Sequence, residues 1–234
     1  MKICLYNDCF LEHRPHFGCE LVRETFLDEF EKRGVEVLGT LKVNQRWDQH
    51  RALLDKADLV VVNGEGSLHH DRRNDLLEIS RQYPSVLVNT VYQENTPNEH
   101  LKNFRYVSGR EIRSVQEMRK YREDVHLVPD VIFLNKRLNV AKSIGEKIAN
   151  VYHFSGIRTL QSADSFLSSV SECNRMNTES FHALIVAKLL GIKTMNVKTS
   201  NTWKNESYLE SVAKMATEEC QRRVGEMFDQ ICQI

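Results

Sequence analysis

The sequence predicts an α/β fold in which a Rossmann-like, mainly parallel sheet is flanked by helices. Short apolar runs alternate with longer amphipathic segments along the chain, which is typical of strand–helix–strand units. Residues 59–62 are continuously apolar, as in strands that are buried on both faces of a sheet. The 234 residues, 41% of them hydrophobic, are enough to bury a substantial core.

The first half contains most of the predicted strands. Residues 3–6 are expected to form the first strand, and a helix is expected over 20–33, where Val22, Phe26 and Phe30 share one face. Gly34 is predicted to end that helix, because glycine is common just past a helix C-terminus. Further strands are expected at 35–38, 59–62, 86–88, 104–108 and 125–128, with further helices at 47–56, 73–82 and 111–122.

The polar stretch 134–148 lacks periodicity and is predicted to link two parts of the chain. They are an N-terminal Rossmann-like domain of residues 1–134 and a small C-terminal α/β part of residues 148–234. Helices are expected at 161–171, at 180–190 and from about 205 onward, with a strand at 192–197. Residues 172–177 are predicted to lead directly into the helix that begins near Ser180.

Composition narrows the classes of function. Lys and Arg together number 32, and so do Asp and Glu, so bulk charge gives no support for binding nucleic acid or an anionic membrane. No apolar run reaches the length of about 18 residues needed to span a membrane, and the first residues do not read as a signal peptide. The six cysteines include no CxxC pair, so we expect reduced thiols in a cytoplasmic protein. No cofactor is predicted, and the oligomeric state is left open.

Unusual polar residues follow four of the predicted strands, at the point where each strand ends. Because ligands of parallel sheets bind outside the carboxyl ends of the strands, these residues are expected to line one cleft. In chain order they are Asn7, Asp8, His16, Gly18, Asn63, Gly64, Glu65, Gly66, Ser67, His69, His70, Arg110, Glu111 and Asp130.

The glycine segment after residue 62 is expected to approach a ligand closely. Gly64 and Gly66 permit positive φ and close backbone contact, and Ser67 is expected to cap a following helix whose amides hold an anion. A plain strand-to-helix turn is the alternative. Arg110 is expected to clamp a phosphate or carboxylate, with a surface ion pair as its alternative, and Asp130 alternatively forms only a turn or N-cap.

His182 is expected in the first turn of a buried helix that Ser180 caps. A histidine at a helix N-terminus suits proton transfer near neutral pH, although a satisfied core histidine is the alternative. His13, His16, His69, His70 and Asp71 are possible metal ligands. Their spacing matches no standard zinc pattern, so no metal is predicted.

These landmarks occur in a fixed order over residues 2–205. They are Asn7-Asp8 with residues 16–19, the run 61–69, residues 108–111 with Ser114, residues 128–130, residues 181–184, and Asn201 with Lys204. The set resembles the polysaccharide pyruvyl transferase family. Here Ser180 stands where that family has an arginine, and the second half is short.

The resemblance implies two Rossmann-like halves facing a cleft, GT-B-like with a reduced second half. It implies transfer of the pyruvyl group of phosphoenolpyruvate to a sugar or glycan, giving a ketal. His182, Asp8 and Glu65 are the expected catalytic residues, and Ser180, Asn201 and Lys204 join the other strand-end residues in substrate binding. Two alternatives stay open: a GT-B-like glycosyltransferase that uses a nucleotide sugar, and a non-catalytic glycan- or partner-binding protein.

Overall fold

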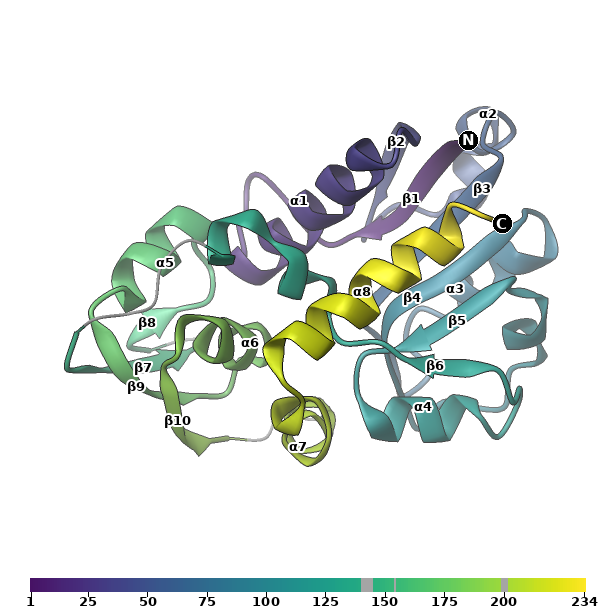
Figure 1. Ribbon diagram of the computed structural model, residues 1–234. Coiled ribbons are helices and arrows are strands. Elements are labelled where there is room, and N and C mark those ends of the chain that lie inside the picture. The colour runs from purple at the N-terminus through teal and green to yellow at the C-terminus, as the bar shows by residue number, and fades with distance from the viewer. Residues whose placement is uncertain (140–144, 154, 199–201) are drawn as a thin grey trace.

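The computed structural model describes residues 1–139, 145–153, 155–198 and 202–234, and within them two separate sheets form (Figure 1). The larger sheet contains β1 (Lys2–Asp8), β2 (Glu36–Lys42), β3 (Leu59–His69), β4 (Ser85–Gln93), β5 (Tyr106–Gly109) and β6 (Val125–Leu127). The smaller sheet contains β7 (Lys147–Tyr152), β8 (Ile157–Arg158), β9 (Cys173–Thr178) and β10 (Lys193–Val197).

Every pair of neighbouring strands is parallel. The strand order is β2-β1-β3-β4-β5-β6 in the larger sheet and β10-β9-β7-β8 in the smaller one. The order of the larger sheet reverses between β1 and β3, and such a switch point is where open α/β sheets bind ligands. The predicted α/β class is confirmed: a Rossmann-like parallel sheet is flanked by helices, and a second, smaller parallel sheet follows it in the chain.

Helices fill the connections between strands. The α-helices are α1 (Phe17–Lys32), α2 (Arg51–Leu54), α3 (Asp75–Glu78), α4 (Ile112–Met118), α5 (Ala163–Val170), α6 (Phe181–Leu190), α7 (Lys204–Glu210) and α8 (Thr217–Ile231). Short 3₁₀ turns are η1 (Trp47–Gln49), η2 (Ile79–Arg81), η3 (Glu99–Asn103), η4 (Val131–Leu134), η5 (Lys136–Asn139) and η6 (Val212–Lys214). In the described part of the chain, no helix has the length and apolar character that a membrane crossing requires.

Alternating residues of the larger sheet enter two hydrophobic cores. On β1, Ile3 and Leu5 join one core, whereas Cys4 and Tyr6 join the other. The first core continues into the smaller sheet, and the ring of Phe17 on α1 stacks on Phe166 of α5 with 3.6 Å between centroids. Each fully buried large apolar side chain contributes about 1.5–3 kcal/mol, so this shared core fixes the two sheets relative to each other.

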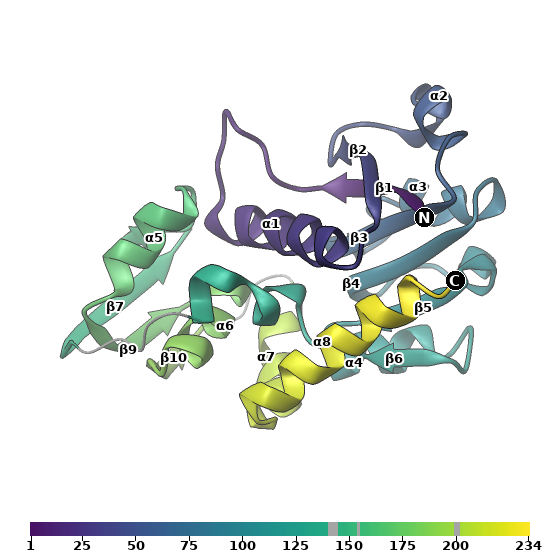
Figure 2. The ribbon, with the colours of Figure 1, turned by 45° about the horizontal axis from the view of Figure 1, so that its top comes forward.

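Helix α8 carries the chain back to the larger sheet. Figure 2 shows it running from the smaller sheet toward the C-terminus, alongside the strands β4 to β6. Its Phe228 ring packs edge-to-face against Phe26 and Phe30 of α1, at centroid distances of 5.7 and 5.2 Å. The end of the chain therefore packs on the first sheet. The division into residues 1–134 and 148–234 stays a prediction.

Three predicted elements are wrong in type or extent. Strand β3 continues to His69, because β4 supplies backbone partners beyond a bulge, pairing with Leu68 and His69. Residues 172–177 are not a lead-in: most of them form β9, the strand between β7 and β10. The predicted single C-terminal helix divides near Ser211, whose φ of −124° and ψ of −82° are not helical. The Gly34 prediction is confirmed, since its φ is 65° directly after the helix cap.

Candidate functional site

Three asparagines on neighbouring strands form the wall behind the site. Asn7, Asn63 and Asn89 lie on β1, β3 and β4, and each is at most 1% exposed. Asn7 Nδ2 donates to the Asn63 carbonyl at 2.6 Å, Asn63 Nδ2 donates to the Asn7 carbonyl at 3.3 Å, and Asn89 Nδ2 donates to Asn63 Oδ1 at 3.1 Å. Asn7 and Asn89 have φ of 68° and 55°, a conformation that asparagine tolerates better than most residues. This ladder joins three neighbouring strands.

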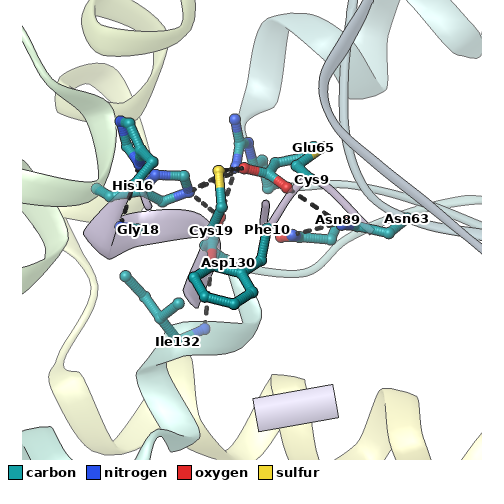
Figure 3. Close-up of polar contacts among 12 residues, drawn as sticks. Cys9, Phe10, His16, Gly18, Cys19, Asn63, Glu65, Asn89, Asp130 and Ile132 are labelled. Carbon is teal, nitrogen blue, oxygen red and sulfur yellow. Dashed lines mark hydrogen bonds and ion pairs between the residues drawn. The ribbon is translucent and has the colours of Figure 1, made fainter. Parts of the chain in front are cut away.

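Glu65 projects from the bulge that follows this ladder. The positive φ in the glycine segment belongs to Glu65, at 37°, and not to Gly64 or Gly66 as predicted. Its carboxylate accepts hydrogen bonds from Asn63 Nδ2 at 3.2 Å and from Cys19 Sγ at 3.2 Å (Figure 3). A left-handed conformation at a non-glycine residue is a form of backbone strain often found at functional sites.

The charge of Glu65 is set by its neighbours. Burial alone would raise the pKa of this carboxyl, but His182 and Arg110, helped by the thiols of Cys19 and Cys9, outweigh it and lower the pKa below its ordinary value. Burial and the nearby carboxylate raise the pKa of both thiols well above their usual range. Glu65 is therefore an anion, and the two cysteines act as protonated hydrogen-bond donors.

Arg110 directly follows β5. It is 1% exposed, and its Nη1 donates to Asp130 Oδ2 at 2.6 Å. The guanidinium carbon lies 4.2 Å from the centroid of the Phe181 ring, within cation–π distance. Burial would raise the pKa of Asp130, but His182 and Arg110 lower it to about 2. The Nε atom of Arg110 is buried and finds no hydrogen-bond partner in the described part of the chain, so the guanidinium retains unused donor capacity.

His182 lies in the first turn of α6, next to Arg110. Ser180 caps this helix, since its Oγ accepts from the amide of Ala183 at 3.4 Å. His182 Nε2 lies 3.4 Å from Arg110 Nη1, 3.7 Å from Asp130 Oδ2 and 3.8 Å from Glu65 Oε1. The imidazole is thus placed between two carboxylates and a guanidinium, with its Nε2 within 4 Å of all three.

A pocket of about 130 Å³ lies at this point, and residues from both parts of the chain line it. Its lining residues are His16, Cys19, Glu65, Gly66, Arg110, His153, Glu179, Ser180, Phe181, His182 and Lys204. His16 caps α1 by accepting the Gly18 amide on Nδ1 at 3.2 Å, and burial together with nearby His182 lowers its pKa to about 3. His16 is therefore a neutral imidazole, whose other ring nitrogen carries the proton.

Lys204 and Arg110 flank the backbone of Gly66. A Cβ added to Gly66 would lie 3.7 Å from Arg110 Nη2 and 3.8 Å from Lys204 Nζ. Burial and the neighbouring Arg110 lower the pKa of Lys204 to about 8. The space above Gly66 is therefore bordered by two nitrogen donors, one permanently charged and one that titrates near neutral pH.

Asp8, predicted as catalytic, lies outside the pocket lining. Its Oδ2 accepts from Lys42 Nζ at 2.6 Å and lies 3.2 Å from Arg23 Nε, and its Oδ1 accepts from the Phe10 amide at 3.0 Å. The carboxylate is fully engaged in joining β1 to β2 and α1. The structure supports a structural role for it.

Glu111 is a helix cap. It is completely buried, and its carboxylate accepts from the amides of Arg113 and Ser114 at the start of α4 and from the Ser114 hydroxyl. The predicted N-cap role of Asp130 is also present, since Asp130 Oδ1 accepts from the Ile132 amide at 3.1 Å. Asp130 thus combines the cap with its ion pair to Arg110, whereas Glu111 only supports the fold.

The other predicted residues divide between the wall and the far end of β3. Ser67 accepts from Asn7 Nδ2 at 3.0 Å and does not cap a helix. Gly64 packs against the Thr90 side chain, which an added Cβ would meet at 2.3 Å. His69 and His70 contact each other through their Nδ1 atoms at 2.9 Å, outside the pocket lining. Asn201 lies outside the described residues.

Several site residues escaped prediction because their sequence signals are weak. Cys19 follows the predicted Gly18, His153 follows β7, and Glu179 and Phe181 surround the predicted Ser180. His153 and Glu179 lie at the carboxyl ends of β7 and β9, two strands that were not predicted. In the part of the chain that the structure describes, no group of three or more histidine, cysteine or acidic side chains is arranged to hold a metal ion.

Comparison with known proteins supports the fold. No protein-family model and no curated protein matches the chain. A protein of uncharacterised function from Klebsiella pneumoniae subsp. pneumoniae NTUH-K2044 is similar in structure, with a TM-score of 0.63 and 18% identity, covering 90% of this chain and 88% of that one.

Two further structures resemble the chain more weakly. An α-glucosyltransferase in complex with UDP and DNA has a TM-score of 0.42 at 11% identity, covering 92% of this chain and 70% of that one. The S. aureus MnaA protein with UDP has a TM-score of 0.35 at 9% identity, covering 86% and 69%. At these scores neither likeness bears on the chemistry of the site.

Proposed function

We propose that this protein is a transferase that moves the pyruvyl group of phosphoenolpyruvate to a sugar or glycan acceptor. One observation carries the proposal: His182 Nε2 lies within 4 Å of Glu65, Asp130 and Arg110, in a pocket that Lys204 also lines. A proton donor beside two cations is the combination that an anionic donor with a phosphate leaving group requires. The resemblance of the ordered motifs to polysaccharide pyruvyl transferases points to the same donor.

Each group has a role in this reaction. Arg110 and Lys204 bind the phosphate and carboxylate of the donor above Gly66. His182 is the general acid that helps the phosphate to leave, and Glu65 faces the acceptor and takes up a proton from an acceptor hydroxyl. In sum, two acceptor hydroxyls lose their protons and form two C–O bonds to the central carbon. The methylene carbon gains a proton and becomes a methyl group, and inorganic phosphate departs.

The size of the pocket favours a small donor. About 130 Å³ accommodates about ten water-sized groups, if each takes up about 10–15 Å³. Phosphoenolpyruvate is of this size, whereas a nucleotide sugar is several times larger and would extend far beyond the lining residues.

Phosphate release tests the proposal. The protein is incubated with phosphoenolpyruvate and a broad panel of sugar acceptors, and acceptor-dependent phosphate is measured. We expect His182→Gln to lower kcat by about 10²–10⁴-fold, the usual contribution of a positioned acid. His13→Gln, the same exchange at an exposed position, should leave the rate unchanged. A folded wild-type protein that releases no phosphate with any acceptor would rule out pyruvyl transfer.

A nucleotide-sugar glycosyltransferase is the second candidate. Ser180 favours it, because this residue stands where the pyruvyl transferase motif has an arginine and its hydroxyl caps α6. A ligand that binds the native state raises the melting temperature, so thermal-shift measurements separate the two donors. Stabilisation by UDP, GDP or CMP, without any by phosphoenolpyruvate, would support the glycosyltransferase. A non-catalytic binding protein would retain its function fully after His182→Ala.

A further inference from the structure

Lys204 differs from a surface lysine in its position. It is the first residue of α7, it is partly buried, and its side chain lines the pocket between the two sheets. It forms no ion pair with any carboxylate in the ranges that the structure describes. Across Gly66 it faces another cation, Arg110. Burial and like charge both favour the neutral amine over the ammonium ion.

The neutral amine is a nucleophile, and a useful fraction of it is present near neutral pH. Burial and Arg110 lower the pKa of Lys204 to about 8. At pH 7.5 this lysine is therefore uncharged in about a quarter of the protein molecules. An ordinary lysine with a pKa near 10.4 is uncharged in only about one molecule in a thousand at that pH. Lysines that form imines with carbonyl compounds are activated in the same way, by desolvation and by a neighbouring cation.

The surroundings of Lys204 define the class of carbonyl compound. Arg110 offers a planar fork with unused donor capacity, which matches a carboxylate. Because residue 66 is a glycine, the position that a Cβ would take is empty. That position lies 3.7 Å from Arg110 Nη2 and 3.8 Å from Lys204 Nζ, so one small molecule can contact both groups. The pocket of about 130 Å³ has room for a molecule of a few carbon atoms.

We propose that Lys204 is a reactive amine that forms an imine with a small α-keto acid whose carboxylate binds Arg110. The Nζ lone pair adds to the carbonyl carbon, the carbonyl oxygen takes up one proton from Nζ and one from solvent and leaves as water, and a protonated C=N bond replaces C=O. Glu65, which lines the same pocket, balances the charge of the protonated imine. This inference uses the pocket of the proposed function, but imine formation requires neither phosphate release nor a sugar acceptor.

Reductive trapping tests the inference. The full-length protein is incubated with pyruvate and cyanoborohydride, which reduces the imine to a stable secondary amine, and the modified lysine is located by peptide mass spectrometry. We expect labelling at Lys204 to exceed that at Lys188 or Lys198 by at least about tenfold, because Lys204 lines the pocket with Arg110 and the other two lysines do not. Acetone, which lacks the carboxylate, should label Lys204 at least about tenfold less than pyruvate at equal concentration.

Two variants make the result specific. Lys204→Arg keeps the positive charge but cannot form an imine, so trapping at this position should vanish, and Lys198→Arg is the matched control that should leave it unchanged. Equal labelling of surface lysines and Lys204, or equal labelling of Lys204 by acetone and pyruvate, would overturn the inference. If pyruvate is trapped while phosphoenolpyruvate yields no phosphate, the proposed function fails and the reactive amine stands. If Lys204→Arg still releases phosphate normally, the amine is not needed for transfer.

Discussion

Replacing Gly18 with alanine should displace His182. Gly18 lies in the first turn of α1, and a Cβ built on it would lie 2.0 Å from His182 Nδ1, 2.3 Å from its Cγ and 2.7 Å from its Cβ. Ordinary contact begins near 3.4 Å, so the imidazole or the helix must withdraw by about 1.4 Å. The neighbouring backbone cannot yield easily, because the Gly18 amide already donates to His16 Nδ1.

The expected effect on stability and activity follows from this displacement. Overpacking of a well-filled interior costs about 1–3 kcal/mol, which for a chain of this size lowers Tm by roughly 2–10 °C. A misplacement of about 1 Å at a reacting group costs about 100-fold in rate. Gly18→Ala should therefore lower both the melting temperature and any activity that depends on His182.

A double-mutant cycle isolates the contact. Thermal and urea unfolding are measured for Gly18→Ala, His182→Ala and the double variant, with Gly225→Ala as control, because an added Cβ on α8 meets nothing within 4 Å. The His182→Ala background removes the contacts at 2.0 and 2.3 Å and keeps only the one to Cβ at 2.7 Å, so we expect a coupling energy above about 1 kcal/mol. Additive effects within about 0.5 kcal/mol would refute the contact between α1 and His182 on which the site geometry rests.

Two further predictions concern the buried carboxylates. Because the pKa of Asp130 is lowered from 3.8 to about 2, its charge stabilises the fold above about pH 4, and this contribution of roughly 2 kcal/mol is lost as pH falls toward 2. Urea unfolding of Asp130→Asn should therefore show a smaller loss of stability over that range than the wild type, and an identical pH dependence would contradict the ion pair with Arg110. Asp8→Asn should destabilise the protein by about 1–3 kcal/mol but leave the Kd for phosphoenolpyruvate within about twofold, as measured by calorimetry; a tenfold weaker Kd would return Asp8 to the site.

Hydrophobic patterning was sufficient to predict the larger sheet. Its central strands β3 and β4 carry apolar runs because both faces are buried, as in residues 59–62. The smaller sheet was harder to predict. In β9, buried, half-buried and exposed residues follow one another without regular alternation. The break before α8 also has no proline or glycine to mark it. Tertiary contacts of Phe228 with Phe26 and Phe30 hold that helix against α1.

Site residues could be predicted where an unusual polar or charged residue directly follows a strand or begins a helix. Arg110, Glu65 and His182, predicted from separate strand ends and a helix start, meet within 4 Å. The prediction of positive φ at Gly64 or Gly66 was wrong. The bulge in β3 gives Glu65 the positive φ, and Asn63 donates a hydrogen bond to the Glu65 carboxylate. Asn89 could not be found from sequence, since its role depends on the pairing of β3 with β4.

A crystal structure with phosphoenolpyruvate bound tests the central claim most directly. The claim is that an anionic donor binds above Gly66, between Arg110 and Lys204 and next to His182. We expect an oxygen of the ligand within about 3 Å of each cation and of His182 Nε2, the reach of a charge-assisted hydrogen bond. An ordered ligand elsewhere on the protein, with the pocket filled only by water at saturating concentration, would contradict the claim.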